Sequence, residues 1–528
     1  MPARVKSGSS LVLAVLAAGQ FLMTLDSSVM NVSMASVAAD LDTSITGIQT
    51  AITLYTLVMA TLMITGGKIG TIIGRRRAFG IGLVVYGAGS FTTGLAPGLP
   101  VLLLGWSLLE GIGAALIMPA IVALVAANFP PERRAGAYGL VAAAGAMAVA
   151  AGPLIGGGVT TFASWRYVFF GEVVLVVAIL AVLRRVKDVP PEPARLDVVG
   201  SLLSIASLGS IVFGVLRSGE WGWVRAQTGG PMFLGLSPVI WLILAGTGLL
   251  YVFLRWQTHL AATDAQPLVD PQLLRNRQLT AGLTMFFSQF TVQAGVFFTV
   301  PLFLSVVLEL SALQTGLRLL PLSVALLVSA AGIPRMWPRA NPRRVVRAGW
   351  ASMIVGILIL VAGLDPGANA GIVALPMLLM GVGLGALASQ LGAVTVSAVP
   401  DSQSAEVGGL QNTATNLGAS LGTALIGSVL IATLSASIVT GIQTNSDVPA
   451  AVKEQASTEL SSGVPFLSDT QLRAAAEDAS IDEARVNDIV QLNADARLEA
   501  LRMALSLTAL LAVTALFFTG AVPQRQPE

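Results

Sequence analysis

The sequence predicts an all-α polytopic membrane protein. Of its 528 residues, 54% are hydrophobic and only 11% are charged, whereas roughly 25% of the residues in an average soluble domain are charged. The mean hydropathy is +0.79. A soluble chain of this length would expose large apolar patches, because so few charges cannot cover its surface. The apolar residues run continuously instead of alternating with polar ones, which excludes a membrane β-barrel.

About fourteen segments are apolar enough to cross a bilayer as helices of about 20 residues. The first part of the chain holds six of them, at 11–34, 48–66, 79–97, 100–127, 136–160 and 165–183. Two more follow, at 197–217 and 232–255. The last part of the chain holds another six, at 280–307, 312–333, 346–364, 370–396, 404–435 and 498–520.

Lysine and arginine gather in alternate short loops, for example at 75–77, 184–187 and 335–347. Loops with this bias face the cytoplasm. The pattern therefore predicts that both termini are cytoplasmic and that the number of spans is even.

One external segment, 436–496, is long, polar and acidic. Within it, residues 468–493 show the pattern of a short amphipathic helix that Asp469 could cap at its N-terminus. The segment is either a solvated connector or a functional element. In the second case we expect a cap over a substrate exit or a contact for an accessory protein.

The composition excludes several function classes. The chain has no cysteine and a single histidine, His259, so sites that need His and Cys for zinc binding or nucleophilic catalysis are not expected. No segment reads G-x-x-x-x-G-K-[ST], which argues against ATP as the energy source. A net charge of +2 gives no reason to expect nucleic acid as a partner. We expect neither an enzyme nor a metal or cofactor.

Two motifs are rich in glycine. In the span at 136–160, Gly145 is followed by Gly152, Pro153, Gly156 and Gly157. A proline inside a helix removes a backbone donor and bends the helix, and small residues let helices approach closely. The motif is either a hinge and seal between two halves of the molecule or ordinary small-residue packing.

The second motif is the basic loop after the span at 48–66, with Gly67, Gly74, Arg75 and Arg76. A similar short basic loop, at 332–344, follows the second span of the last six. Such weak internal symmetry is typical of transporters.

On these residues the chain resembles the major facilitator superfamily, and within it the fourteen-span drug:proton antiporters. Residues 145–157 are similar to the antiporter signature, and residues 67–76 are similar to the cytoplasmic loop pattern. The resemblance implies a major facilitator fold with two six-helix bundles, at 1–190 and 279–528. Residues 191–278 would supply two extra linker transmembrane helices and a cytoplasmic loop, and the C-terminal bundle would carry the external loop 436–496.

Three positions depart from the family pattern. The usual aspartate of the basic loop is Thr71, so its gating role does not transfer to this chain. The span at 100–127 lacks the family's intramembrane arginine and carries Glu110 in place of a glutamine. The span at 165–183 carries Glu172 in place of an asparagine.

Three carboxylates fall inside the predicted spans: Asp26, Glu110 and Glu172. Burying a charge there costs at least about 2.5–3.5 kcal/mol, so such residues are functional candidates. At about 1.5 Å per helical residue, all three lie at a similar depth. The resemblance places the spans of Asp26 and Glu110 around a central cavity, where these two side chains could face each other.

We hypothesise that Asp26 and Glu110 form a coupling site for protons and substrate, with Glu172 and Arg318 as further candidates. Burial and a neighbouring carboxylate both favour the protonated form of a carboxyl group. The unprotonated site would attract a cation, so proton and substrate would compete for it. Alternatively, the acids only pack helices and are neutralised by Thr24, Ser107 or Arg318. Arg318 could also extend its charge to the cytoplasmic face.

The resulting expectation is a multi-pass protein of the plasma membrane that exports amphipathic drugs, cationic ones among them, in exchange for protons. Its partners would be the small substrate, protons and the lipid bilayer, and we expect a monomer. An exporter of a lipid, glycolipid or endogenous metabolite is the alternative within transport. A non-transporting sensor or scaffold is the alternative from a different class.

Overall fold

The structure is a computed structural model that describes residues 7–129, 131–188, 191, 195–227, 230–263, 265–337, 339–365, 369–399, 404–444, 464–478 and 483–524. Within these ranges the regular structure is helical, apart from one isolated β-bridge between Phe233 and Leu236. The fold is therefore the all-α membrane fold that the sequence predicts.

The helices of the N-terminal half are α1 (Ser7–Asp40), α2 (Ile45–Ile73), α3 (Arg75–Gly94), α4 (Leu99–Leu102), the π-helix η1 (Leu103–Glu110), α5 (Gly111–Asn128), α6 (Pro131–Phe162) and α7 (Arg166–Leu183). The linker helices are α8 (Val198–Trp221) and α9 (Pro238–Ala262). The helices of the C-terminal half are η2 (Leu273–Arg275), α10 (Arg277–Leu302), the π-helix η3 (Phe303–Val307), α11 (Ala312–Met336), α12 (Pro342–Gly363), η4 (Ala370–Val373), α13 (Ala374–Val396), α14 (Ser404–Thr444), α16 (Asp469–Asp478), α17 (Glu483–Phe518) and η7 (Thr519–Ala521).

Every predicted span falls on a helix, but the structure does not confirm the number fourteen. Among the described residues, twelve helices are long and apolar enough to cross a membrane, or thirteen if the bent α6 counts as one span. Helix α3, on the predicted span 79–97, is not among them because it begins with Arg75, Arg76 and Arg77 and is rich in glycine.

Polar side chains at several helix starts explain where the chain turns back. Ser44 caps α2 by accepting a hydrogen bond from the Gly47 N–H. Ser311 and Gln314 cap each other's backbone at the start of α11. Such caps satisfy N–H groups that the helix itself leaves without partners. The two helices consequently begin directly after short turns.

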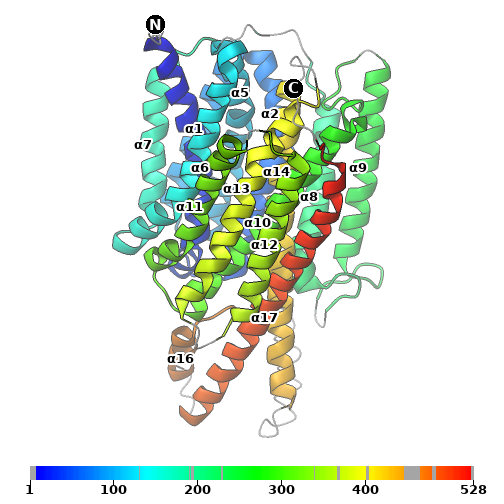
Figure 1. The fold of residues 1–528 in the computed structure, drawn as a ribbon. Helices are drawn as coiled ribbons and strands as arrows, with labels where there is room; N and C mark the ends of the chain where they lie inside the picture. Colours follow the sequence, from blue (N-terminus) through cyan, green and yellow to red (C-terminus); the bar gives the residue numbers. More distant parts are fainter. Residues whose placement is uncertain are drawn as a thin grey trace.

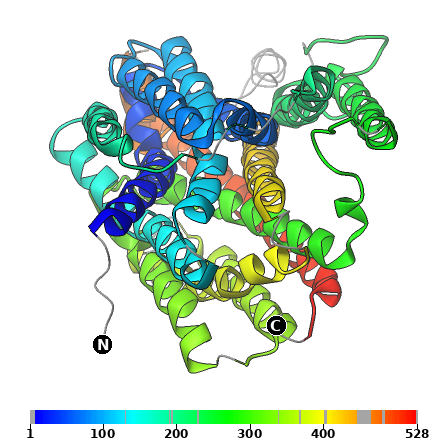
Figure 2. The same cartoon turned by 90° about the horizontal axis from the view of Figure 1, so that it is seen from above.

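The two halves meet mainly along two helix pairs, α2 with α14 and α6 with α11. Viewed along the helices, the linker helices α8 and α9 lie at the edge of the molecule, with α8 next to α2 and α14 (Figure 2). The linker pair therefore covers one side of the seam between the halves.

Helix α1 begins, and α17 ends, at the same end of the molecule, and α16 lies at the opposite end (Figure 1). The helix order places the basic segments 75–77 and 335–347 at the end where α1 begins. We call this end the terminal end and the other the distal end.

The segment 436–496 is more helical than the sequence analysis predicts. Helix α14 continues to Thr444, and α17 already begins at Glu483. The predicted short helix over 468–493 is in fact α16, which begins at Asp469, followed by the first turns of α17. A small apolar cluster joins α16 to α17 through Leu472, Ala476, Val486 and Val490. This packing stabilises helices beyond the apolar spans. Residues 445–463 and 479–482 lie outside the described residues.

Candidate functional site

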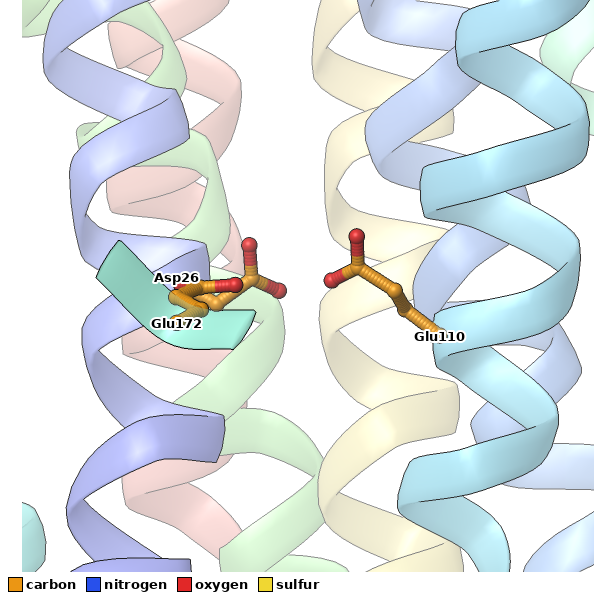
Figure 3. Close-up of side chains that lie close together, drawn as sticks. All are labelled: Asp26, Glu110 and Glu172. Atoms are coloured by element: carbon orange, nitrogen blue, oxygen red, sulfur yellow. The ribbon is translucent and has the colours of Figure 1, made fainter. Parts of the chain in front are cut away.

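The three intramembrane carboxylates lie together inside the N-terminal half. Asp26 comes from α1, Glu110 is the last residue of η1, and Glu172 comes from α7. One carboxylate oxygen of each lies within 4.8 Å of the other two. Figure 3 shows the carboxyl groups pointing toward one another from separate helices. Their exposed fractions are 1%, 0% and 2%. The pair Asp26 and Glu110 is thus enclosed within one half, whereas the resemblance suggests that the two could face each other in a central cavity.

Each carboxylate accepts hydrogen bonds from neutral side chains. The indole Nε1 of Trp106 donates to both oxygens of Asp26, at 2.8 and 3.0 Å. Thr93 donates to Oε1 of Glu110 at 3.2 Å. We name the group formed by the three acids and their donors the acid cluster. The donors to Glu172 also belong to it, and they are Tyr86, at 3.1 Å, and Ser90, at 2.9 Å.

The local sequence explains this arrangement. Tyr86, Ser90 and Thr93 are spaced four and three residues apart, which puts them on one face of α3. Gly89 lies beside them, and a Cβ at this position would come within 2.6 Å of Cγ of Glu110. Glycine therefore lets α3 approach the acid. Trp106 precedes Glu110 by four residues within the π-helical turn, a feature often found at functional sites.

Two polar atoms of the acid cluster have no hydrogen-bond partner among the described residues. They are Oε2 of Glu110 and Oε1 of Glu172. The ring of Tyr55 stacks on Trp106, with centroids 5.0 Å apart and an interplanar angle of 9°. Buried polar atoms without partners are costly. These atoms therefore leave room for a proton or another cation in the cluster.

The electrostatics of three close carboxylates also favour a bound proton or another cation in the acid cluster. Two unit charges at the 4.8 Å limit of this group repel by roughly 3.5 kcal/mol at an effective dielectric constant of about 20. None of the hydrogen bonds to the three acids that the described residues show comes from lysine or arginine. Full ionisation would therefore be strongly unfavourable unless a cation is bound. Carboxylate oxygens are also the ligands that hard metal ions prefer.

The residues proposed from sequence to neutralise the acids make no hydrogen bond to them among the described contacts. Thr24 donates to the carbonyl of Gln20, and Ser107 donates to the carbonyl of Ala51. Arg318 is exposed on α11, in the other half. It lies six residues from the distal start of α11, so it is far from the terminal end, which the lysine and arginine bias predicts to be cytoplasmic. Sequence reasoning missed the actual donors, although the regular spacing on α3 was a usable signal.

The glycine motif of α6 packs against two helices at once. A Cβ on Gly152 would lie 2.2 Å from Oγ of Ser28, and one on Gly156 would meet Val29, both on α1. A Cβ on Gly157 would lie 2.5 Å from the carbonyl oxygen of Ala312 on α11. Gly145, nearer the terminal end, faces Gln20 and Thr24 of α1 at wider spacing. The motif thus belongs to the seam between the halves.

Pro153 frees a backbone carbonyl that accepts a hydrogen bond across this seam. Because proline has no N–H, the carbonyl of Val149, four residues earlier, loses its helical partner. Oγ of Ser323 on α11 donates to this carbonyl at 3.3 Å. Helix α6 is bent by 41° between Ala143–Val149 and Ala151–Phe162. The proline therefore bends α6 and exposes an acceptor that the opposite half satisfies.

The basic loop ties α2 and α3 to the segment that follows α7. Nη1 of Arg75 donates to the carbonyl of Gly67 at 2.6 Å. The backbone N–H of Arg76 donates to Oδ1 of Asp188 at 2.8 Å, and Nε of Arg76 lies 3.9 Å from the other carboxylate oxygen. Gly74 has a φ of +99°, a conformation that favours glycine. Asp188, which the sequence analysis did not select, thus supplies a carboxylate to the loop, which carries Thr71 where the resemblance implies an aspartate.

Comparisons with known proteins show the family of this chain. The family model described as the Major Facilitator Superfamily matches residues 16–423. The tetracenomycin C resistance and export protein of Streptomyces glaucescens is 29% identical over 79% of this chain and 74% of its own length. The cephamycin export protein CmcT of Amycolatopsis lactamdurans is 30% identical over 79% of this chain and 84% of its own length.

Solved structures show the same fold. A bacterial homologue of the human lysosomal transporter Spinster, in an inward-facing and unoccupied conformation, aligns with a TM-score of 0.62. The alignment covers 98% of both chains at 14% sequence identity. At this identity the likeness concerns the fold alone.

Proposed function

We propose that this chain, which belongs to the Major Facilitator Superfamily, exports amphipathic drugs, cationic ones among them, in exchange for protons. It is a multi-pass membrane protein. We further propose that its terminal end faces the cytoplasm, as the lysine and arginine bias indicates. Its distal end would then face outward, and the three-part division at 190 and 278 would separate the two moving halves from the linker helices.

The observation that carries the proposal is the acid cluster. Three carboxylates lie within 4.8 Å, their partners are neutral, and two of their oxygens have no partner among the described residues. Such a group is stable when it holds protons and is strained when it loses them. A conformational change that opens it to water on one side would therefore release protons there. The named relatives are resistance and export proteins, which supports export as the direction of transport.

Helix α1 connects the acid cluster to the seam between the halves. Asp26 on this helix is two residues from Ser28 and three from Val29, which contact the glycine motif of α6. A change of charge at Asp26 would thus act on the helix that packs against the seam. In this proposal the protonation state biases the seam between its open and closed forms.

The test is efflux of an ethidium-type lipophilic cation from energised cells that express the protein. We expect export that a protonophore abolishes and that Asp26→Asn, alone or with Glu110→Gln, reduces to background. Asp488→Asn, on the exposed face of α17, is the matched control and keeps full export. Efflux at the wild-type rate by the double variant, or by the wild type in the presence of the protonophore, would refute proton coupling through the acid cluster.

Absence of efflux of any drug-like cation by the wild type would favour the alternative cargo, a lipid, glycolipid or endogenous metabolite. Reconstituted vesicles with an imposed pH gradient then separate the two cargo classes. A coupled exporter releases protons when substrate is added, whichever cargo is correct, and the non-transporting alternative releases none.

A further inference from the structure

A large cavity opens at the distal end, away from the acid cluster. Its volume is about 660 Å³. We name it the distal vestibule. Three segments line it: residues 32–45, at the end of α1 and in the turn to α2; residues 305–312, between α10 and α11; and residues 465–471, before and in α16. The first belongs to the N-terminal half and the other two to the C-terminal half, so the vestibule lies across the seam.

The charges that the described residues bring to the distal vestibule have one sign. These charged lining residues are Asp42 and Glu309, and no lysine or arginine of the described part of the chain lines the vestibule. The rest of the lining combines hydroxyl groups with apolar surface, including Ser36, Val306 and Phe466. Acidic groups beside apolar surface suit a cation with an apolar body.

The wall formed by residues 464–478 is anchored by a buried arginine. Arg497 of α17 has an exposed fraction of 0% and forms an ion pair with Asp469, at the start of α16. Its Nη1 also donates to the carbonyl of Leu467 at 2.7 Å and to that of Val306 at 3.4 Å. A buried charge costs little only when it is paired and hydrogen-bonded. The wall therefore supplies the partners that Arg497 requires.

Further contacts fix the same wall to the C-terminal half. Glu309 accepts hydrogen bonds from the N–H and the hydroxyl of Thr470, at 2.9 and 2.8 Å. The N–H of Val464 donates to Ser435 of α14 at 3.2 Å. These bonds reach the wall from α14, α17 and the turn before α11. The wall must move with the C-terminal half when the two halves separate.

We propose that the distal vestibule is an exit site for the cationic substrate, and that the segment 464–478 forms its outer wall through the Arg497–Asp469 ion pair. This inference rests on the proposed function. Substrate leaving the seam would pass the negative lining of Asp42 and Glu309. The wall would cover one side of that lining until the halves separate.

The chain has no cysteine, so one introduced cysteine is the only thiol available for labelling. Ser36→Cys places it in the vestibule, and Thr440→Cys places it on the exposed distal part of α14 as the control. The probes are two impermeant methanethiosulfonates, one with a trimethylammonium and one with a sulfonate. We expect the ratio of the cationic to the anionic labelling rate to be about three- to tenfold higher at Ser36→Cys than at the control. The reason is that two negative charges lie near Ser36 and are partly screened by salt.

Asp42→Asn should lower this preference without distorting the turn, because asparagine also accepts the positive φ of +48° at this position. Asp469→Asn should raise the rate of both probes at Ser36→Cys, because Arg497 loses its ion pair and the wall loosens. It should leave the control rate unchanged. Equal reaction of both probes at Ser36→Cys would overturn the acidic vestibule, and an unchanged rate in Asp469→Asn would overturn the anchored wall.

The exit assignment has its own measurement. A lipophilic cation that the cells export should protect Ser36→Cys, and not the control, from labelling in energised cells. Lack of protection by an exported cation overturns the exit site. Failure of the proposed function is seen separately, as no efflux of that cation by the wild type. In that case the exit assignment fails with it, while the charge preference measured in de-energised membranes still decides whether the vestibule selects cations.

Discussion

Gly157 offers the sharpest test of the seam between α6 and α11. In Gly157→Ala, the new methyl group would lie 2.5 Å from the carbonyl oxygen of Ala312. The two helices would have to move apart by about 0.9 Å to reach an ordinary contact of 3.4 Å. Overpacking of this kind costs about 1–3 kcal/mol. The closed seam should therefore become about 5- to 150-fold less favourable.

The neighbouring glycine provides a matched control. A Cβ on Gly158 would meet only Leu313, at 4.0 Å, so Gly158→Ala fits without movement. Both substitutions gain the same helix propensity, about 1 kcal/mol, and the comparison cancels it. We expect Gly157→Ala to lower the melting temperature of the purified protein and its efflux rate, and Gly158→Ala to lower neither. Equal melting and equal efflux of the two variants would refute the close backbone contact at the seam.

Three further predictions concern single contacts. Ser323→Ala should lower stability by about 1–3 kcal/mol, because an α6 carbonyl loses its donor, and Ser323→Thr should restore it in denaturation experiments. Asp188→Ala should destabilise the start of α3 by about 0.5–2 kcal/mol, as loss of a helix cap does, and Asp188→Asn, which can still accept from the Arg76 N–H, should cost less in the same measurement. Although burial raises the pKa of Glu309, hydrogen bonds from Thr470 hold it below the ordinary value of 4.5. The ionised form therefore anchors the vestibule wall at neutral pH, and the anchor is lost as the pH falls below 4.5. Hydrogen exchange of residues 464–478, corrected for the pH dependence of the intrinsic exchange rate, should increase in the wild type as the pH falls from about 5 to about 3, and Glu309→Gln should show a smaller increase.

The family and the helical architecture could be predicted from the sequence because they depend on local patterns. Continuous apolar runs fix where helices can lie in a bilayer, and the glycine and proline residues at 145–157 identify a close helix contact. The helical rise of about 1.5 Å per residue placed Asp26, Glu110 and Glu172 at a similar depth in the membrane. The structure brings one carboxylate oxygen of each within 4.8 Å of the others. Span counting was less secure for α3, because its arginines and glycines weaken its apolar pattern.

The partners of these residues were not predicted. Asp26 and Glu110 were expected to face each other in a central cavity, yet all three acids are enclosed by α1, α3, η1 and α7. Which side of a helix faces its neighbours depends on rotation and tilt, and an almost uniformly apolar helix gives no periodic signal for either. The sequence analysis therefore did not select Trp106, Ser90 and Tyr86.

The sequence by itself determined that this chain is a helical membrane protein of the facilitator type with rare buried acids, since hydrophobicity and residue type are local properties. Only the tertiary structure decided that Arg497 pairs with Asp469, that Asp188 serves the loop at Arg76, and that Ser323 satisfies the carbonyl freed by Pro153. Each of these contacts joins residues far apart in the chain. Their formation depends on how whole helices pack, which no short segment of sequence encodes.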